Sequence, residues 1–192
     1  QVLTVPTNSR NFDDFQLMKG LLANAKTKEV TLSTGYKTAT DDKKAKELTK
    51  KTRALVDRFG MMGKVFNIQE VNTFTNPQNI VILTTPEVAA MLDVELLATA
   101  FNMEKAEMGR RIVKIDSFQK YDEQQKQFVA DDKVELMIVD EDYIQFRRTL
   151  ECSESFRNAD KLTTNIFTHN QGIACVCGFV NAVKILNSAR GQ

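Results

Sequence analysis

The sequence has few of the residue types from which catalytic sites are usually built. Its only histidine is His169, and its eight glycines are scattered, so none of them forms a GxGxxG or GxxxxGK phosphate-binding loop. A Ser or Cys nucleophile with an imidazole base would have to use His169, which lies in a strand-like stretch where histidine is usually structural. These absences favour a function without catalysis.

Cysteine is equally sparse. The three thiols are those of Cys152, Cys175 and Cys177, and this odd number argues against a disulfide framework. Cys175 and Cys177 lie two positions apart with no second pair at zinc-binding spacing, so a zinc site is not predicted either. Reduced thiols in a cytoplasmic setting are the expected state.

Long apolar runs are absent as well. No stretch approaches the roughly 20 apolar residues that a membrane span needs, and the N-terminus lacks the pattern of a signal peptide. The 192 residues are 42% apolar, which is enough to bury a core in one large domain or two small lobes. The net charge of +1 gives the whole chain no attraction to nucleic acid or to an anionic membrane.

Helical periodicity is clearest in the first third of the chain. Apolar spacing predicts an amphipathic helix over 8–26 and a second helix over 41–59, with Thr40 as its N-cap and Gly60 as its stop. Five lysines between positions 43 and 51 lie on the second helix. A solvated face is the simpler interpretation of these lysines, and contact with phosphate is the alternative.

Further boundaries are marked by single residues. Pro86 and Asp93 each predict the start of a helix, and Gly109 predicts the end of a short helical segment. Apolar and β-branched runs predict strands at 79–85, 110–116 and 134–140, and mostly strand structure over 143–186, with one long strand over 163–185 that is bent or broken at Gly172.

An acidic triplet, Asp140-Glu141-Asp142, ends the apolar run 134–140. Phosphatases of the haloacid dehalogenase type place two aspartates at this spacing, one to attack phosphorus and one to move the proton, with magnesium between them. The motif here is incomplete, because no Gly-Thr follows the second Asp and no downstream acidic pair completes the metal site. The simpler interpretation has Asp140 ending a strand and Asp142 capping a turn or short helix.

The stretch 93–118, DVELLATAFNMEKAEMGRRIVKIDSF, predicts a compact unit of two short helices, a corner and a strand. It resembles a segment of the major capsid proteins of small short-tailed phages, the picovirus-type podophages, whose subunits have the Hong Kong 97 (HK97)-like capsid fold. TTPEVAAML, VELMIVDEDYIQ and GFVNAVKI resemble further segments in the same order, so the resemblance covers roughly 10–186. The residues of the stretch that match the pattern are Asp93, Val94, Leu97, Ala98, Ala100, Phe101, Asn102, Met103, Gly109, Asp116 and Phe118.

The resemblance implies an α+β fold of the HK97-like capsid type. Residues 35–150 would form an axial-type domain. Residues 1–34, with the end of the spine helix, and 151–192, with the return strands, would form parts of a peripheral-type domain. Nothing in the sequence corresponds to the N-terminal arm and extended loop that precede the long helix in that family, so the chain is expected to be a fragment.

The function implied by the resemblance is structural. Copies of the full-length protein would assemble in the bacterial host cytoplasm, as pentamers and hexamers, into the icosahedral head of a tailed bacteriophage that encloses double-stranded DNA without sequence specificity. The portal and possibly a scaffold would be further partners, and no cofactor, metal or membrane is implied. Two alternatives remain: an encapsulin-type compartment shell, and a magnesium-dependent phosphatase that uses the Asp140/Asp142 turn.

The compact unit supplies one set of site predictions. Asp93, Phe101, Asn102 and Met103 are expected to form a structural corner. Phe101 would close the apolar side of a short helix that is not stable alone, and Asn102 suits the conformation that ends it. No catalytic, cofactor-binding or metal-binding residue is predicted.

The segment 119–133 supplies the other set of site predictions. It is too polar for a core and too long for a minimal turn, so it predicts an exposed loop or a hairpin tip. We expect it to project from the axial-type domain towards the symmetry axis of a capsomer. Its two aromatic residues, Tyr121 and Phe128, are candidate subunit-interface residues, with packing on their own domain as the alternative.

Overall fold

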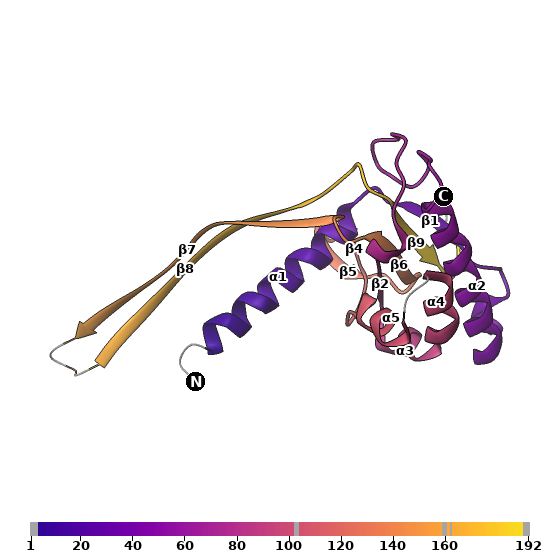
Figure 1. Cartoon of the computed structure of the whole chain (residues 1–192). Coiled ribbons are helices and arrows are strands. Elements are labelled where there is room, and N and C mark those ends of the chain that lie inside the picture. The colour runs from indigo at the N-terminus through magenta and orange to yellow at the C-terminus, as the bar shows by residue number, and fades with distance from the viewer. Residues whose placement is uncertain (1–3, 102–103, 159–160, 162, 190–192) are drawn as a thin grey trace.

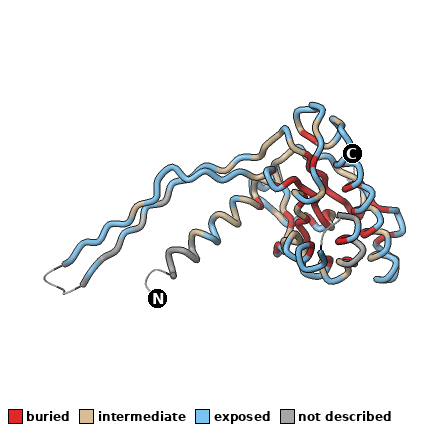
Figure 2. Tube along the Cα trace, viewed as in Figure 1, coloured by how far each residue is buried: buried red, intermediate tan, exposed pale blue. Residues whose placement is uncertain are grey.

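The structure, a computed structural model, describes residues 4–101, 104–158, 161 and 163–189. It consists of an α/β body and a long arm that extends away from it (Figure 1). Nearly all buried residues lie in the body, while the arm is largely exposed (Figure 2). The mixture of helices and strands confirms the predicted α+β class. None of the described helices combines the length and apolar character that a membrane span requires.

The sheet at the centre of the body has five strands: β1 (Lys28–Thr31), β2 (Ile80–Thr84), β3 (Ile112–Lys114), β6 (Val134–Asp140) and β9 (Ala182–Leu186). Their order is β1-β9-β6-β2-β3, with β1 parallel to β9 and β2 parallel to β3. β6 runs antiparallel to both of its neighbours. Because β6 and β9 are covered on both faces, nearly all their residues are buried.

Side chains alternate along β6 between two hydrophobic clusters. Leu136 and Ile138 pack with the helices on one face of the sheet, and Met137 and Val139 pack on the other face with Leu22 of the first helix. The helices of the first face are α2 (Asp41–Phe59), α3 (Pro86–Met91), α4 (Val94–Phe101) and α5 (Lys105–Arg111). Two single turns of 3-10 helix, η1 (Tyr36–Thr38) and η2 (Pro77–Asn79), connect elements of the body.

The helix boundaries agree with the sequence in most places. α2 follows Thr40 and ends at Gly60 as predicted, although the Thr40 side chain makes no capping hydrogen bond. α3 begins at Pro86 as predicted. The prediction that Gly109 ends a helix is wrong, because α5 continues to Arg111. The buried Met108 side chain holds this turn in place and outweighs the weak helix propensity of glycine.

The arm consists of helix α1 (Thr4–Asn24) and a ribbon of two antiparallel strands, β7 (Ile144–Asn158) and β8 (Thr163–Val176). The strand-rich character of 143–186 is therefore confirmed. The prediction of one strand over 163–185 is wrong, because the chain turns after Val176 and re-enters the body. Gly178 accepts a hydrogen bond from the backbone of Gln69 within this turn.

The division of the chain into body and arm differs from the boundaries expected from the sequence. β1 and β9 lie in the body sheet, whereas the ranges 1–34 and 151–192 assign them to the peripheral-type domain. Val183 and Ile185 are buried in the core beneath the helices, and Val30 packs against it. Only α1 and the ribbon leave the body.

The segment 119–133 forms a hairpin of strands β4 (Gln119–Asp122) and β5 (Gln127–Ala130). A hairpin tip was one of the two predicted forms. The hairpin lies against α1, and its projection towards the symmetry axis of a capsomer stays a prediction. The Phe128 ring faces Gly20 of α1, where a Cβ atom added to the glycine would lie 3.8 Å from the ring.

Candidate assembly surface

The acidic triplet after β6 forms a turn. The Asp140 carboxylate accepts a hydrogen bond from the Asp142 N–H at 3.0 Å, and the Asp140 carbonyl accepts one from the Tyr143 N–H at 2.9 Å. Asp140, rather than Asp142, therefore supplies the side-chain bond of the turn. Glu141 points elsewhere and pairs with Arg111 at 2.8 Å. The described part of the chain contains no group of His, Cys, Asp and Glu side chains suited to a metal ion.

The predicted corner is described only in part. Asn102, Met103 and the side chain of Phe101 lie outside the described residues. Asp93 stands directly before α4, and its carbonyl accepts a hydrogen bond from the Leu97 N–H at 3.0 Å, as the first turn of a helix requires. Leu97 is buried in the body core, while the role of the corner stays a prediction.

Tyr121 and Phe128 face each other across the β4–β5 hairpin. Their ring centroids are 5.4 Å apart in an edge-to-face arrangement. Tyr121 is 45% exposed and Phe128 is 43% exposed. The Phe128 ring faces Gly20 of its own chain, and a role in a subunit interface stays a prediction for both residues.

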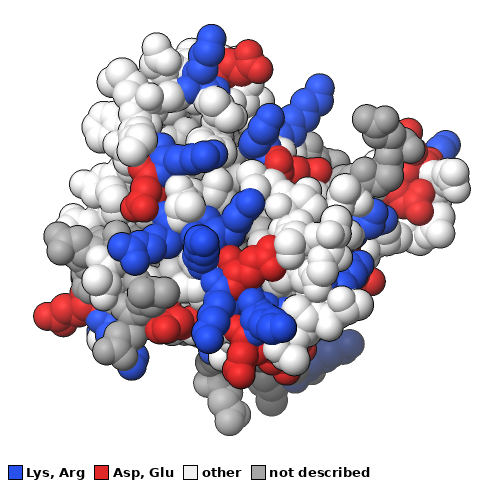
Figure 3. All heavy atoms as spheres, turned by 90° about the vertical axis from the view of Figure 1, so that its right-hand side faces the viewer, with Lys and Arg blue, Asp and Glu red and all other residues white. Residues whose placement is uncertain are grey.

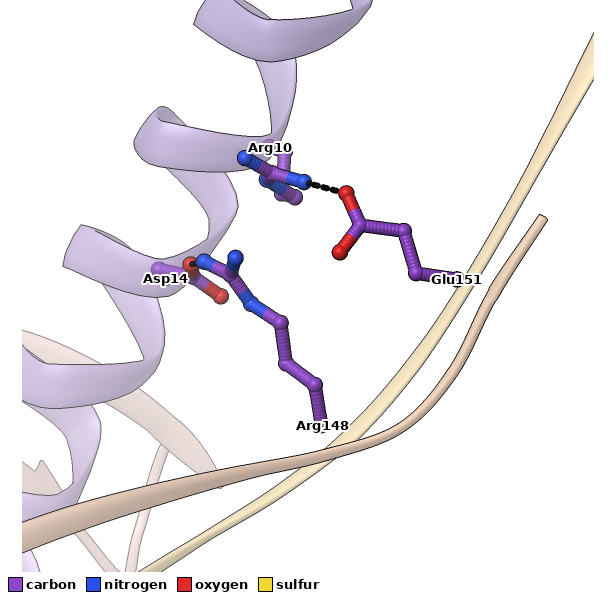
Figure 4. Close-up of polar contacts among 4 residues, drawn as sticks. All are labelled: Arg10, Asp14, Arg148 and Glu151. Atoms are coloured by element: carbon purple, nitrogen blue, oxygen red, sulfur yellow. Dashed lines mark hydrogen bonds and ion pairs between the residues drawn. The ribbon is translucent and has the colours of Figure 1, made fainter. Parts of the chain in front are cut away.

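Two ion pairs of opposite polarity hold α1 against the ribbon. Arg10 of α1 pairs with Glu151 of β7, and Asp14 of α1 pairs with Arg148 of β7 at 3.1 Å (Figure 4). Arg10 and Asp14 lie one helical turn apart. A slip of the ribbon by one turn would bring like charges together, so the two pairs specify the register between helix and ribbon.

A bulge in β7 makes both pairs possible. Residues 148 and 151 would face opposite sides of a regular strand, because side chains alternate along it. The register shifts between Arg148 and Leu150, and the extra residue turns Arg148 and Glu151 to the same side. The strand partners around the shift are Arg148 with Gly172 and Leu150 with Gln171.

Gly172 occupies the strand position opposite this bulge. A Cβ atom there would lie 3.2 Å from the carbonyl oxygen of Arg147, which is tighter than an ordinary contact. Glycine therefore permits the close approach of the two strands. The break predicted at Gly172 corresponds to this irregularity, although β8 continues through it.

The side of the ribbon that faces away from α1 carries an apolar row of Leu150, Phe156, Phe167 and Ile173. Their strand positions place all four on the side opposite Arg148 and Glu151. The Phe156 and Phe167 rings contact each other with centroids 5.8 Å apart. All four side chains are about half exposed or more, and Ile173 is 65% exposed. A row of this kind on an isolated ribbon is typical of a surface that another molecule covers.

Cys152 and His169 are strand partners within the same row. Cys152 is half-buried and His169 is exposed, and both belong to the ribbon as the strand-like sequence predicted. The three cysteines are free thiols. These residues add no separate site to the ribbon.

Buried lysines fix the other end of α1 to the body. The Lys19 ammonium lies 2.9 Å from both carboxylate oxygens of Asp116, and its hydrogen bond holds the pKa of Asp116 below its usual value. Lys184 of β9 donates to the carbonyl of Leu22 at 2.7 Å, near the C-terminal end of α1 where a cation is favourable. The direction of the helix is thus set by contacts at its base.

Tyr143 closes the junction between body and ribbon. It is fully buried where β6 leads into β7, and its hydroxyl shares a hydrogen bond with the Thr27 hydroxyl at 2.9 Å. Burial raises the pKa of the Tyr143 phenol, and the bond to Thr27 offsets part of that rise. The body therefore leads into the ribbon through a buried junction closed by a hydrogen bond.

Comparison with known sequences identifies the family. Residues 1–186 match the family of Phi29-like phage major capsid proteins. The chain belongs to this family. It is 31% identical over 193 residues to the major capsid protein of Bacillus phage GA-1, and 27% identical over 191 residues to that of Bacillus phage PZA. These alignments cover 98% and 94% of the chain but only 38% of each relative, so the chain spans well under half of their length.

The structural comparison agrees with this family. The capsid structure of Staphylococcus phage Andhra superimposes with a TM-score of 0.65 at 14% identity, covering 98% of this chain and 66% of that one. This similarity confirms the HK97-like capsid fold. The sequence predicted the strands over 143–186, but it did not predict that they pair into a ribbon that leaves the body. The signal of the ribbon was the recurrence of large apolar residues among polar ones in 144–176.

Proposed function

We propose that this chain is the shell-forming part of a major capsid protein, which assembles with copies of itself into an icosahedral head around double-stranded DNA. The observation that carries the proposal is the apolar row on the outer side of the ribbon. The row has no cover within the described chain, yet ion pairs and a bulge hold it in one orientation. Surfaces with both properties suit repeated contact with a neighbouring subunit.

The parts of the chain would divide this work. The body, with its five-stranded sheet and helices, would serve as the axial-type domain, and α1 with the ribbon would belong to the peripheral-type domain. The chain's partners would be further copies of itself in pentamers and hexamers, the portal and, where assembly needs one, a scaffold. The virion would be its location after assembly in the bacterial host cytoplasm, and the role is structural rather than catalytic.

The alternatives receive no support from the relatives. The residues of the proposed phosphatase site form an ordinary turn at Asp140. Magnesium-dependent hydrolysis of a chromogenic phosphate ester is expected to be absent, and turnover abolished by Asp140→Asn would favour the phosphatase instead. An encapsulin-type shell would enclose protein cargo rather than DNA.

Particle formation by the full-length gene product tests the proposal. We expect closed heads of uniform size under negative-stain microscopy when it is expressed, with a scaffold if one is needed. A product that stays monomeric both alone and with the other head-assembly proteins would contradict the proposal.

A further inference from the structure

Helix α2 carries a row of basic side chains on the body, well apart from the ribbon. Lys43, Lys46, Lys50 and Arg53 are all exposed and recur at intervals of three and four residues. At about 100° per residue they fall within an arc of about 80°, roughly opposite the buried side of the helix. Figure 3, which views the side of the body where α2 lies, shows basic side chains gathered on this face, with acidic side chains beside them.

These four cations, which we call the α2 row, form no ion pair with any residue that the structure describes. The helix as a whole has seven basic and four acidic residues, whereas the complete chain is close to neutral. Positive charge is therefore concentrated on α2. A local concentration of this kind attracts polyanions although the net charge does not.

Of the four acidic residues of α2, Asp41 and Asp42 precede the row, Asp57 follows it and only Glu47 lies between its ends. Asp41, in the first turn, approaches Lys44 to 3.8 Å. Glu47 accepts hydrogen bonds from the backbone N–H and the hydroxyl of Ser33 at 2.6 and 2.8 Å. Asp57 is exposed on the same side of the helix one turn beyond Arg53, and it marks the end of the row.

The geometry of the row favours a stiff, evenly charged partner. From Lys43 to Arg53 it spans about 15 Å along the helix axis at 1.5 Å per residue. Duplex DNA carries one charge per about 1.7 Å, so this length holds about nine phosphates on two strands, roughly half of which face the protein. The row itself has no aromatic side chain on which bases could stack, which argues against a single-stranded ligand. A flexible acidic peptide would lose more conformational entropy on a straight row.

We propose that the α2 row binds the phosphate backbone of double-stranded DNA without reading its sequence. This inference rests on the proposed function, in which the shell encloses DNA, and it adds the surface of the body that touches that DNA. Contacts of this kind are individually weak. They gain their effect from repetition over many subunits.

Binding of two unrelated 30-base-pair duplexes to this chain, followed by fluorescence anisotropy over a range of salt concentrations, tests the inference. The test variant is K43Q/K46Q/K50Q/R53Q. The control variant is K26Q/K28Q/K120Q/K126Q, which removes the same charge from four exposed lysines around the base of α1 and the β4–β5 hairpin. A third variant, K43R/K46R/K50R, keeps the charge of the row, and thermal midpoints check that each variant is folded.

We expect the test variant to lose at least about ten-fold in affinity for both duplexes, with a salt slope smaller by about 3 to 4. The control variant should stay within about two-fold of the wild type, as should the charge-preserving variant. Equal losses in test and control variants would overturn the inference, because net charge alone would then explain binding. Tighter binding of polyglutamate than of duplex DNA would also overturn it, in favour of an acidic protein partner.

Failure of the inference is distinguishable from failure of the proposed function. The test substitutions in the full-length protein should leave particle formation intact while DNA binding by the chain is lost. If the wild type forms particles and the test variant still binds DNA, only the inference is wrong. If the wild type forms no particles, the proposed function fails whatever the binding result.

Discussion

Lys19 is almost completely buried, with 3% of its side chain exposed, and its ammonium lies 2.9 Å from both carboxylate oxygens of Asp116, whose side chain is 61% exposed. The two partners therefore depend on each other unequally. Asp116 can be solvated by water without Lys19, whereas Lys19 has little access to water without Asp116. Removal of either residue should reveal this asymmetry in the anchoring of α1.

Asp116→Ala is expected to lower the free energy of unfolding by about 1–3 kcal/mol, because it leaves a buried ammonium without its partner. Lys19→Met should cost less than about 1 kcal/mol, because it replaces the ammonium with an apolar group of similar length and leaves an exposed carboxylate. Urea denaturation of both variants measures the difference. Equal losses of unfolding free energy in the two variants would show that the pair contributes through its charge interaction alone.

The same pair predicts a dependence on acid. In the folded state, the hydrogen bond from Lys19 lowers the pKa of Asp116 below the ordinary value of 3.8. The Asp116 carboxylate therefore binds a proton more readily in the unfolded chain than in the folded one. The stabilisation is complete above that ordinary value and is lost as pH falls through the lower, folded pKa. Asp116→Asn should therefore lose less stability than the wild type between pH 5 and pH 3, as measured by thermal midpoints. If the thermal midpoints of the variant and the wild type fell equally with pH, the lowered pKa of Asp116 would be contradicted.

Gly20→Ala tests the position of the β4–β5 hairpin. A methyl group there would meet the Phe128 ring at 3.8 Å, an ordinary contact, and alanine favours the helix. We expect the unfolding free energy to rise by about 0.5–1 kcal/mol. Gly109→Ala is the matched control, because nothing lies within 4 Å of its Cβ position. A loss of stability in Gly20→Ala alone would mean that Phe128 packs more tightly on α1 than described.

The turn at Asp140 gives a prediction about metal binding. The double variant D140N/D142N keeps an acceptor for the Asp142 N–H, so its unfolding free energy should fall by no more than about 1 kcal/mol. Titration calorimetry with magnesium should give no binding heat for either form. A measurable magnesium affinity in the wild type that disappears in the double variant would restore the metal-site interpretation.

Local signals in the sequence predicted most of the body. The start of α3 at Pro86, the end of α2 at Gly60 and the buried strand β6 each follow from neighbouring residues. Gly109 was misleading, because the burial of Met108 decides that turn and burial depends on distant residues. Tyr121 and Phe128 could be recognised from the sequence as the aromatic residues of this segment, but the helix that their hairpin lies against, α1, is about a hundred positions away in the chain.

For the ribbon, the sequence predicted the strands but not which side each residue faces. Strand propensity over 143–186 was clear, yet the facing of its side chains depends on one extra residue between Arg148 and Leu150. A shift of one residue exchanges the two sides of a strand, so the alternating pattern cannot be assigned until the bulge is known. The residues that pair with Arg148 and Glu151 are Asp14 and Arg10 of α1, which are more than a hundred positions away in the chain. The effect of the bulge on these contacts is therefore seen only in the structure.

We expect the outer side of the ribbon to serve as a surface for assembly and to contribute little to the fold of a single chain. The substitutions F156S/F167S remove both aromatic rings of the apolar row, and F156L/F167L is the matched control that keeps the row apolar. In this chain, the serine variant should shift the thermal midpoint by no more than about 2 °C, since the rings are already about half exposed.

Particle yield of the full-length protein, measured by sucrose gradient and electron microscopy, is the direct test. We expect F156S/F167S to abolish closed particles, whereas F156L/F167L should assemble like the wild type. Normal particles from the serine variant, in yield and in size, would contradict this expectation.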